Sequence, residues 1–74
     1  MFSLIDVLDI INDGSIVILY NVYHDVISIY DGKDSINEFY NYCMVTDIFA
    51  DFIPGIQNGS IISAIGIEID YEGE

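Results

Sequence analysis

The chain has 74 residues, enough for one small domain, and we expect a single acidic domain over residues 1–74. It carries nine Asp and four Glu against one Lys and no Arg, which gives a formal net charge of -12. One cation cannot hold a nucleic-acid backbone, because binding through counterion release needs several basic side chains. The apolar content of 53% also excludes a disordered chain, since high charge produces disorder only when hydrophobicity is low.

The first predicted element is a helix that begins after Ser3. Ser3 is a suitable N-cap and Asp6, three residues later, completes a capping box. The spacing of Leu4, Leu8 and Ile11 places one apolar face toward a core. The run 12–14, Asn-Asp-Gly, supplies the stop signal, because glycine readily adopts the left-handed conformation that ends helices.

Four strands and one short helix follow. The β-branched and apolar content predicts strands over residues 15–20, 26–30, 43–49 and 60–71, and a second capping box predicts a short helix over residues 35–41. Because the connections between consecutive strands are short, we expect an antiparallel sheet. The fold class is therefore α+β, with the N-terminal helix packed on a four-stranded antiparallel sheet, in the order helix-strand-strand-short helix-strand-strand.

The acids form two predicted rows. Alternation in the last strand separates an isoleucine-rich face from a face that carries Glu68, Asp70 and Glu72. On the first helix, a second row occupies one flank and consists of Asp6, Asp9 and Asp13. Like charges on one face repel each other, so both rows are unfavourable to folding. Two explanations remain open: a charged surface that only keeps the protein soluble, or a surface that imitates a nucleic-acid backbone.

The magnitude of the charge favours the second explanation. Duplex DNA carries about one charge per 1.7 Å of axis, so twelve charges match roughly 20 Å of duplex. A domain of this length has an expected radius of gyration of about 11 Å, hence a diameter near 30 Å. Its charge per unit length therefore approaches that of a short DNA segment. Such a body would be steered rapidly to a basic cleft.

The sequence predicts no catalytic, cofactor or metal site. His24, Ser28 and Cys43 are not spaced to converge as a nucleophile with its base, so we expect a protein that is not an enzyme. The acids after residue 30 do not match a calcium loop, since Lys33 occupies a ligand position, and turn and capping chemistry explains them. Tyr40 and Tyr42 are the predicted exposed anchors for a partner, because tyrosine supplies contact area with a polar tip.

Location is predicted from the N-terminal segment and from Cys43. The first residues lack a positive charge, and Asp6 and Asp9 interrupt their apolar stretch, so they do not resemble a signal peptide. No apolar run approaches the roughly 20 residues of a membrane helix, and an acidic surface is repelled by anionic lipid. A single cysteine suits a reducing compartment. We therefore expect a cytoplasmic protein without a membrane partner.

In size, acidity and α+β layout, the chain resembles the small inhibitors that phages use against host defence, among them acidic anti-CRISPR proteins that mimic DNA. No diagnostic motif accompanies this resemblance, and those proteins share no common fold, so it transfers no residue roles. It implies stoichiometric inhibition in the host cytoplasm, with the protein in a basic DNA-binding groove of a CRISPR effector or another defence nuclease. The alternatives are a homodimeric structural or assembly module, which would use the surplus isoleucine as an interface, and an immunity or antitoxin protein with no nucleic-acid link.

Overall fold

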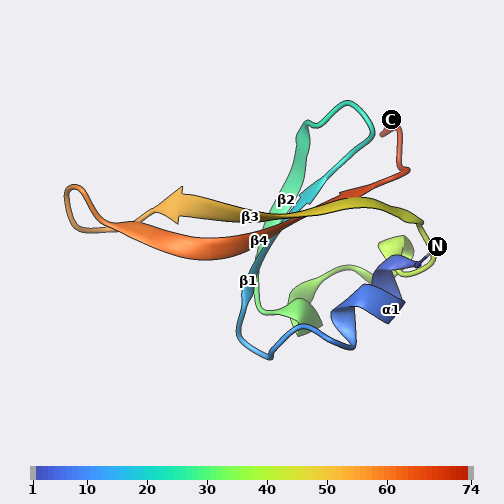
Figure 1. Ribbon diagram of the computed structural model, residues 1–74, viewed down its shortest axis with the longest axis horizontal. Coiled ribbons are helices and arrows are strands. Elements are labelled where there is room, and N and C mark those ends of the chain that lie inside the picture. The colour runs from blue at the N-terminus through green and yellow to red at the C-terminus, as the bar shows by residue number, and fades with distance from the viewer. Residues whose placement is uncertain (1, 74) are drawn as a thin grey trace.

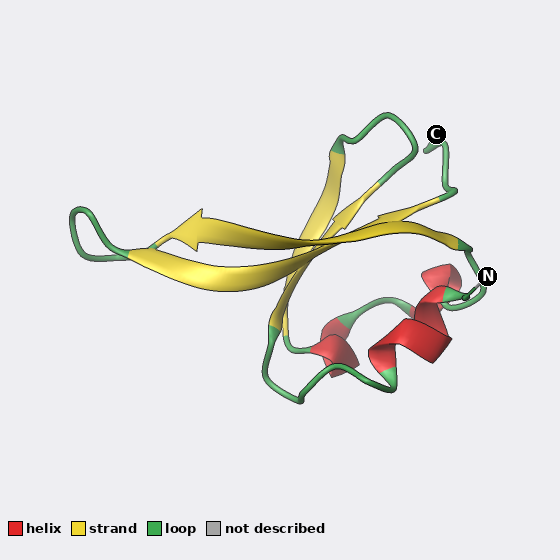
Figure 2. Ribbon diagram, viewed as in Figure 1, coloured by secondary structure: helices red, strands yellow, loops and turns green. Residues whose placement is uncertain are grey.

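A computed structural model describes residues 2–73 and shows an α+β fold with little helix (Figures 1 and 2). The elements in chain order are α1 (Leu4–Leu8), β1 (Ile16–Tyr20), β2 (Val26–Asp31), the 3-10 turns η1 (Lys33–Ser35) and η2 (Glu38–Tyr40), β3 (Val45–Pro54) and β4 (Ile61–Ile69). In Figure 2 the helical segments lie together on one side of the sheet. In the part of the chain described, no helix is long and apolar enough to cross a membrane.

The sheet is mixed, with the strand order β2-β1-β4-β3. Two antiparallel hairpins, β1–β2 and β3–β4, join through a parallel pair between β1 and β4, which runs from Val17 opposite Ile65 to Tyr20 opposite Glu68. The prediction of an all-antiparallel sheet was therefore wrong at its centre. Short connections make consecutive strands antiparallel, as both hairpins confirm, but β1 and β4 are not consecutive and that rule does not govern them.

The core lies between the sheet and the helical side. Leu4 of α1, Val17 and Leu19 of β1, and Ile67 and Ile69 of β4 are fully buried. The isoleucine face of β4 is therefore the face that the helix covers, a choice that alternation alone leaves open. Ile36, between the two 3-10 turns, is buried in the same cluster, so the connection from β2 to β3 helps close the core.

Helix α1 ends at Leu8 and not at residues 12–14 as predicted. Its start is held as expected, because the Ser3 N–H and Oγ both donate to the Asp6 carboxylate, at 3.3 and 2.9 Å. Beyond Leu8 the backbone tightens, since the Ile11 N–H bonds to the Leu8 carbonyl at 3.2 Å, and the Lys33 Nζ donates to the carbonyl oxygens of Leu8 at 2.9 Å and Ile11 at 2.7 Å. A distant ammonium group thus satisfies the terminal carbonyls, a role that local stop residues usually fill.

Three further boundaries differ from the predictions. In place of the predicted helix over residues 35–41 the structure has one 3-10 turn, η2, since η1 already ends at Ser35. The Asn37 side chain, not Ser35, accepts the capping bond from the Phe39 N–H at 2.9 Å. Strand β3 continues past Phe49 to Pro54, because its residues pair with β4 along the whole hairpin. Strand β4 stops at Ile69, two residues earlier than predicted.

Replacing Lys33 by Met should lower the free energy of unfolding by about 1 to 2 kcal/mol, because two hydrogen bonds from a charged donor are lost, although the Leu8 carbonyl still accepts from the Ile11 N–H. Lys33 also lies 3.3 Å from the Asp13 carboxylate, but the Asp13 side chain is 84% exposed. Asp13→Asn should therefore cost less than about 0.5 kcal/mol. Urea unfolding of both variants measures the difference, and equal losses would show that the ion pair, and not the carbonyls, gives Lys33 its role.

Candidate functional site

The charge of the surface is almost uncompensated. No charged side chain among residues 2–73 is buried, so the described carboxylates all reach solvent. The single lysine is largely withdrawn, since its side chain is only 19% exposed and its ammonium group is bound at the end of α1. Within the described chain, only Asp13 and Glu68 are paired with a basic side chain. The acidic surface is therefore the feature most available to a partner.

The predicted row on the first helix does not form. Asp6 lies in α1, Asp9 is the C-cap residue, and Asp13 lies in the following turn beside Lys33. The prediction was wrong because the helix ends before the row is complete. Asp6 and Asp9 are exposed and lie three residues apart in the chain, whereas Asp13 forms an ion pair with Lys33.

The predicted row on the last strand is also broken. Glu68 is in β4, but the strand ends at Ile69 and Asp70 lies in a bend. There the Asp70 Oδ1 accepts a hydrogen bond from the Met44 N–H at 3.0 Å, while the Asp70 N–H donates to the Met44 carbonyl at 3.0 Å. Glu72 is exposed beyond this bend. The pairing with Met44 thus replaces the extended face on which the row was predicted.

Of the two predicted aromatic anchors, only one is exposed. Tyr42 is 81% exposed, as expected. Tyr40 is half-buried against the core, with its ring edge-on to Phe39 at 5.1 Å and to Tyr71 at 5.3 Å. Phe39, which was not predicted as an anchor, is 67% exposed at the edge of this aromatic group. The prediction for Tyr40 was wrong because the 3-10 turn directs its ring inward.

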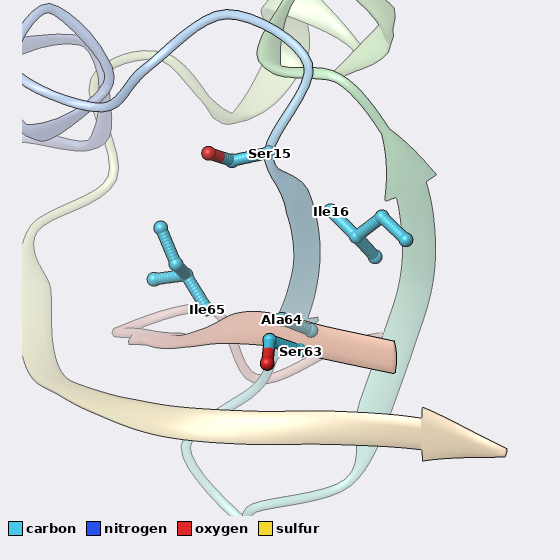
Figure 3. Close-up of a pocket in the computed structure, with 5 residues that line it drawn as sticks. All are labelled: Ser15, Ile16, Ser63, Ala64 and Ile65. Carbon is cyan, nitrogen blue, oxygen red and sulfur yellow. The ribbon is translucent and has the colours of Figure 1, made fainter. Parts of the chain in front are cut away.

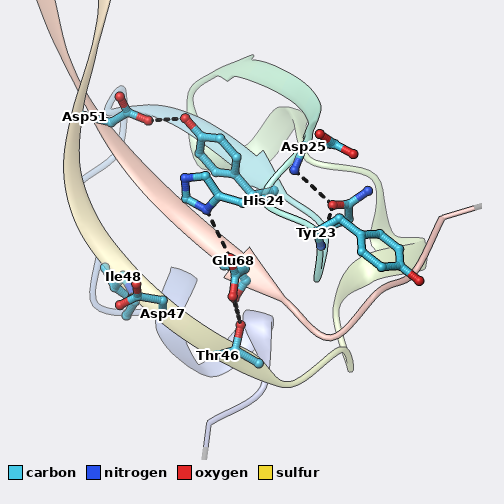
Figure 4. A network of polar contacts seen from close by, with 10 residues as sticks. Tyr23, His24, Asp25, Thr46, Asp47, Ile48, Asp51 and Glu68 are labelled. Carbon is cyan, nitrogen blue, oxygen red and sulfur yellow. Dashed lines mark hydrogen bonds and ion pairs between the residues drawn. The ribbon is translucent and has the colours of Figure 1, made fainter.

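On the sheet face opposite α1, the structure brings together acids and aromatic rings that the sequence analysis did not connect (Figure 4). This acid–aromatic cluster consists of Tyr20 and His24 from the β1–β2 hairpin, Phe49 and Asp51 from β3, and Glu68 from β4. Asp47 is the cross-strand partner of Glu68. Asp51 lies beyond the end of the predicted third strand, and the position of Asp47 opposite Glu68 depends on the register of that strand. Only knowledge of the β3–β4 pairing could therefore have placed these acids together.

The rings of the cluster pack against one another, and one of them, Phe49, lies over a glycine. Tyr20 and His24 are stacked with centroids 4.5 Å apart and planes 13° apart, and Phe49 lies 5.3 Å from Tyr20. Gly66 sits beneath Phe49, because a Cβ atom there would come within 2.2 Å of the Phe49 ring. The Asn21 Oδ1 accepts from the N–H groups of Tyr23 and Asp25, and this turn holds His24 at a φ of 63° (Figure 4).

Hydrogen bonds fix two carboxylates of the cluster. The Tyr20 hydroxyl donates to Asp51 at 2.5 Å, and this bond, together with burial, raises the pKa of Tyr20 to about 12, because a phenolate beside a carboxylate is disfavoured. Glu68 contacts His24 Nδ1 at 3.1 Å and accepts from the Thr46 hydroxyl at 2.8 Å, and both bonds lower the pKa of Glu68. The cluster therefore presents oriented negative charge.

The chemistry of the described residues gives no activated nucleophile. Burial, followed by the charge of Asp70, raises the pKa of the Cys43 thiol and so reduces its thiolate fraction. Among residues 2–73, no group of three His, Cys, Asp or Glu side chains could hold a metal ion. A small hollow beside the start of β1 is lined by Ser15, Ile16, Ser63, Ala64 and Ile65 and contains two hydroxyls but no titratable group (Figure 3).

Comparison with known proteins identifies no relative: no family model, no curated protein and no solved structure matches this chain.

Replacing Tyr20 by Phe should lower the free energy of unfolding by about 1.5 kcal/mol at pH 7, the lower end for a hydrogen bond to a charged group. Because the pKa of Tyr20 is raised in the folded state, this stabilisation is complete below pH 10 and is lost as the pH rises through about 12. Urea unfolding of both proteins at pH 8, 10 and 11 measures the trend. A difference that stays constant over this range would contradict the assignment.

Proposed function

We propose that this protein is a non-enzymatic inhibitor that occupies a basic nucleic-acid-binding surface of another protein, with its carboxylates in place of phosphates. The observation that carries the proposal is the uncompensated surface: thirteen acids against one lysine, with that lysine bound to the carbonyls of α1. A solubilising surface normally mixes charges of both signs and reaches a net charge of about 2 to 8 in magnitude. The value of -12 lies outside that range.

The dimensions of the protein support a short mimic. It measures 37 × 25 × 19 Å, and its radius of gyration of 12.1 Å is slightly above the value of about 11 Å expected for its length. Twelve charges match roughly 20 Å of duplex, so the charge density along the longest axis is about half that of DNA. This density is sufficient for long-range steering toward a cationic groove.

The class of target follows from the same chemistry. Carboxylates that lack a basic partner in the protein itself are available to the Lys and Arg side chains of a groove that normally binds phosphates. The resemblance to small phage inhibitors makes a CRISPR effector or another defence nuclease in the host cytoplasm the first target to test.

A homodimer that pairs two copies of β3 is opposed by the residues of that strand, which lies at an edge of the sheet. The N–H groups of Ile48 and Phe52 donate to the side chains of Asp47 and Asp51, at 2.9 and 2.8 Å. At the end of the strand, Pro54 has no N–H to donate. Charged side chains and proline are typical protection against edge-to-edge pairing, so a dimer joined through β3 would have to break these bonds.

The test is competition with DNA on a purified partner captured by the protein from host lysate. We expect the protein to displace labelled duplex DNA from that partner with a stoichiometry of one, and its affinity to fall steeply between 50 and 200 mM salt, because the contacts are ionic. A partner that binds no nucleic acid, or DNA that does not compete, would contradict the proposal.

A charge-reduced variant sharpens this test. It replaces five exposed acids by amides of the same shape: Asp25→Asn, Asp31→Asn, Asp34→Asn, Asp47→Asn and Glu72→Gln. Its affinity for the partner should fall at least tenfold and depend less on salt. The matched control changes the exposed neutral residues Asn12→Gln and Gln57→Asn and should bind like the wild type. Equal affinity of all three proteins would show that the acids do not make the contact.

A further inference from the structure

An apolar groove runs between α1 and β3 on the side of the sheet that faces the helix. Two adjoining hollows of about 540 and 440 Å³ form it, and both are lined by Val7, Ile10 and Ile48. Phe2 lines one hollow, while Ala50 and Ile65 line the other. We call this surface the α1–β3 groove.

The groove exists because α1 is too short to cover the sheet. Five helical residues span about 7.5 Å, whereas the nine residues of β4 span roughly 30 Å. The helix reaches the pairs near Ile67 and leaves the outer pairs of the hairpin uncovered, so that Phe52 and Ile61 on this face are 62% and 70% exposed. Ile10, just after the helix, is 81% exposed above the groove.

The residues around this apolar floor are acidic. Asp6 lines the groove, and the exposed Asp9 directly precedes Ile10 in the chain, whereas Asp47 lies on the opposite face as the cross-strand partner of Glu68. The one lysine is held at the end of α1 beside Asp13, and it forms no ion pair with Asp6 or Asp9. An apolar floor with a negative rim is complementary to a surface that has an apolar stripe flanked by cations.

We propose that the α1–β3 groove binds an amphipathic helix of the partner that has leucine-like residues on one face and Lys or Arg on its flanks. The proposal rests on the proposed function, since it assigns the contact area of the same basic partner. The six steps from Ile48 to Pro54 cover about 20 Å, which matches a helix of about 13 residues. Apolar side chains at i, i+3, i+4 and i+7 are the usual anchors for such a groove.

Two other occupants fit the groove less well. A second copy of the chain would bring another charge of -12 and the same acidic rim, so like charges would face each other. An extended strand would have to pair with β3, where the N–H groups of Ile48 and Phe52 are already bound by Asp47 and Asp51.

The probe is a fluorescent 14-residue peptide of Leu and Lys with leucine at helical spacing. It is compared with a peptide of identical composition in which the leucines are scrambled out of that spacing. We expect the helical peptide to bind at least tenfold more tightly at 150 mM salt, because only its apolar stripe fits the groove. Backbone chemical shifts of the protein should change at Val7, Ile10, Ala50 and Ile65. Equal affinity of the two peptides, or shifts confined to the opposite sheet face, would overturn the proposal.

Substitutions in the protein provide the second arm. Ile10→Ser and Ile48→Ser remove exposed side chains of the groove and should each weaken the helical peptide at least fivefold. Ile56→Ser, at a fully exposed position in the β3–β4 turn, is the matched control and should leave affinity unchanged. Identical peptide binding by all three variants would overturn the proposal. A dimer of the free protein in sedimentation that Ile10→Ser dissociates would also overturn it, because the occupant of the groove would then be a second copy.

The outcomes separate the two proposals. Peptide binding lost in the Ile10→Ser variant, together with DNA displacement retained, would leave the acidic inhibitor in place and remove the groove from its contact area. Peptide binding retained, together with no DNA competition on the captured partner, would leave the groove in place and reject the nucleic-acid mimic.

Discussion

The parallel pairing of β1 with β4 determines where the core and the surface clusters of this protein form. It is the strand pairing that joins two hairpins, each formed from neighbouring strands, and it places both β1 and β4 at the sheet centre. The same pairing sets Val17 and Leu19 beside Ile65 and Ile67, which creates the apolar surface that α1 covers. It also sets Tyr20 beside Glu68, so the acid–aromatic cluster on the other face is a product of the same register.

Local patterns were sufficient to predict most strands and the isoleucine face of β4, because β-branched residues and alternation act within a few residues. They were insufficient wherever a distant contact decides the outcome. Lys33 binds the carbonyls at the end of α1 from more than twenty residues away, the pairing with β4 carries β3 out to Pro54, and Asp70 turns back to Met44. Both predicted rows of acids failed for this reason: each assumed an element that tertiary contacts cut short. The cluster around Tyr20 was missed because it depends on strand register, which alternation does not determine.

In the proposed complex, the acidic surface and the apolar groove make different contributions to binding. Charges bring a cationic partner to the surface and favour one orientation, whereas apolar area supplies most of the affinity that survives in salt. Lys33 adds no separate basic patch to this surface, because its ammonium group is held against the Leu8 and Ile11 carbonyls and beside Asp13. Asp47 and Asp51 contribute twice, since they add charge and also protect the exposed edge of β3.

The central position of β4 also has a consequence for synthesis of the chain on the ribosome. Forty residues separate the end of β1 at Tyr20 from the start of β4 at Ile61, so the sheet centre closes only after β4 has been synthesised and has met β1. Closure of such a long loop is slow, and during this time β1 offers an unpaired apolar edge. Nine of the thirteen acids and the lysine precede Ile61, so the emerging segment already has a net charge of -8. Repulsion between two copies that meet before closure opposes contact of their open edges until each chain supplies its own β4.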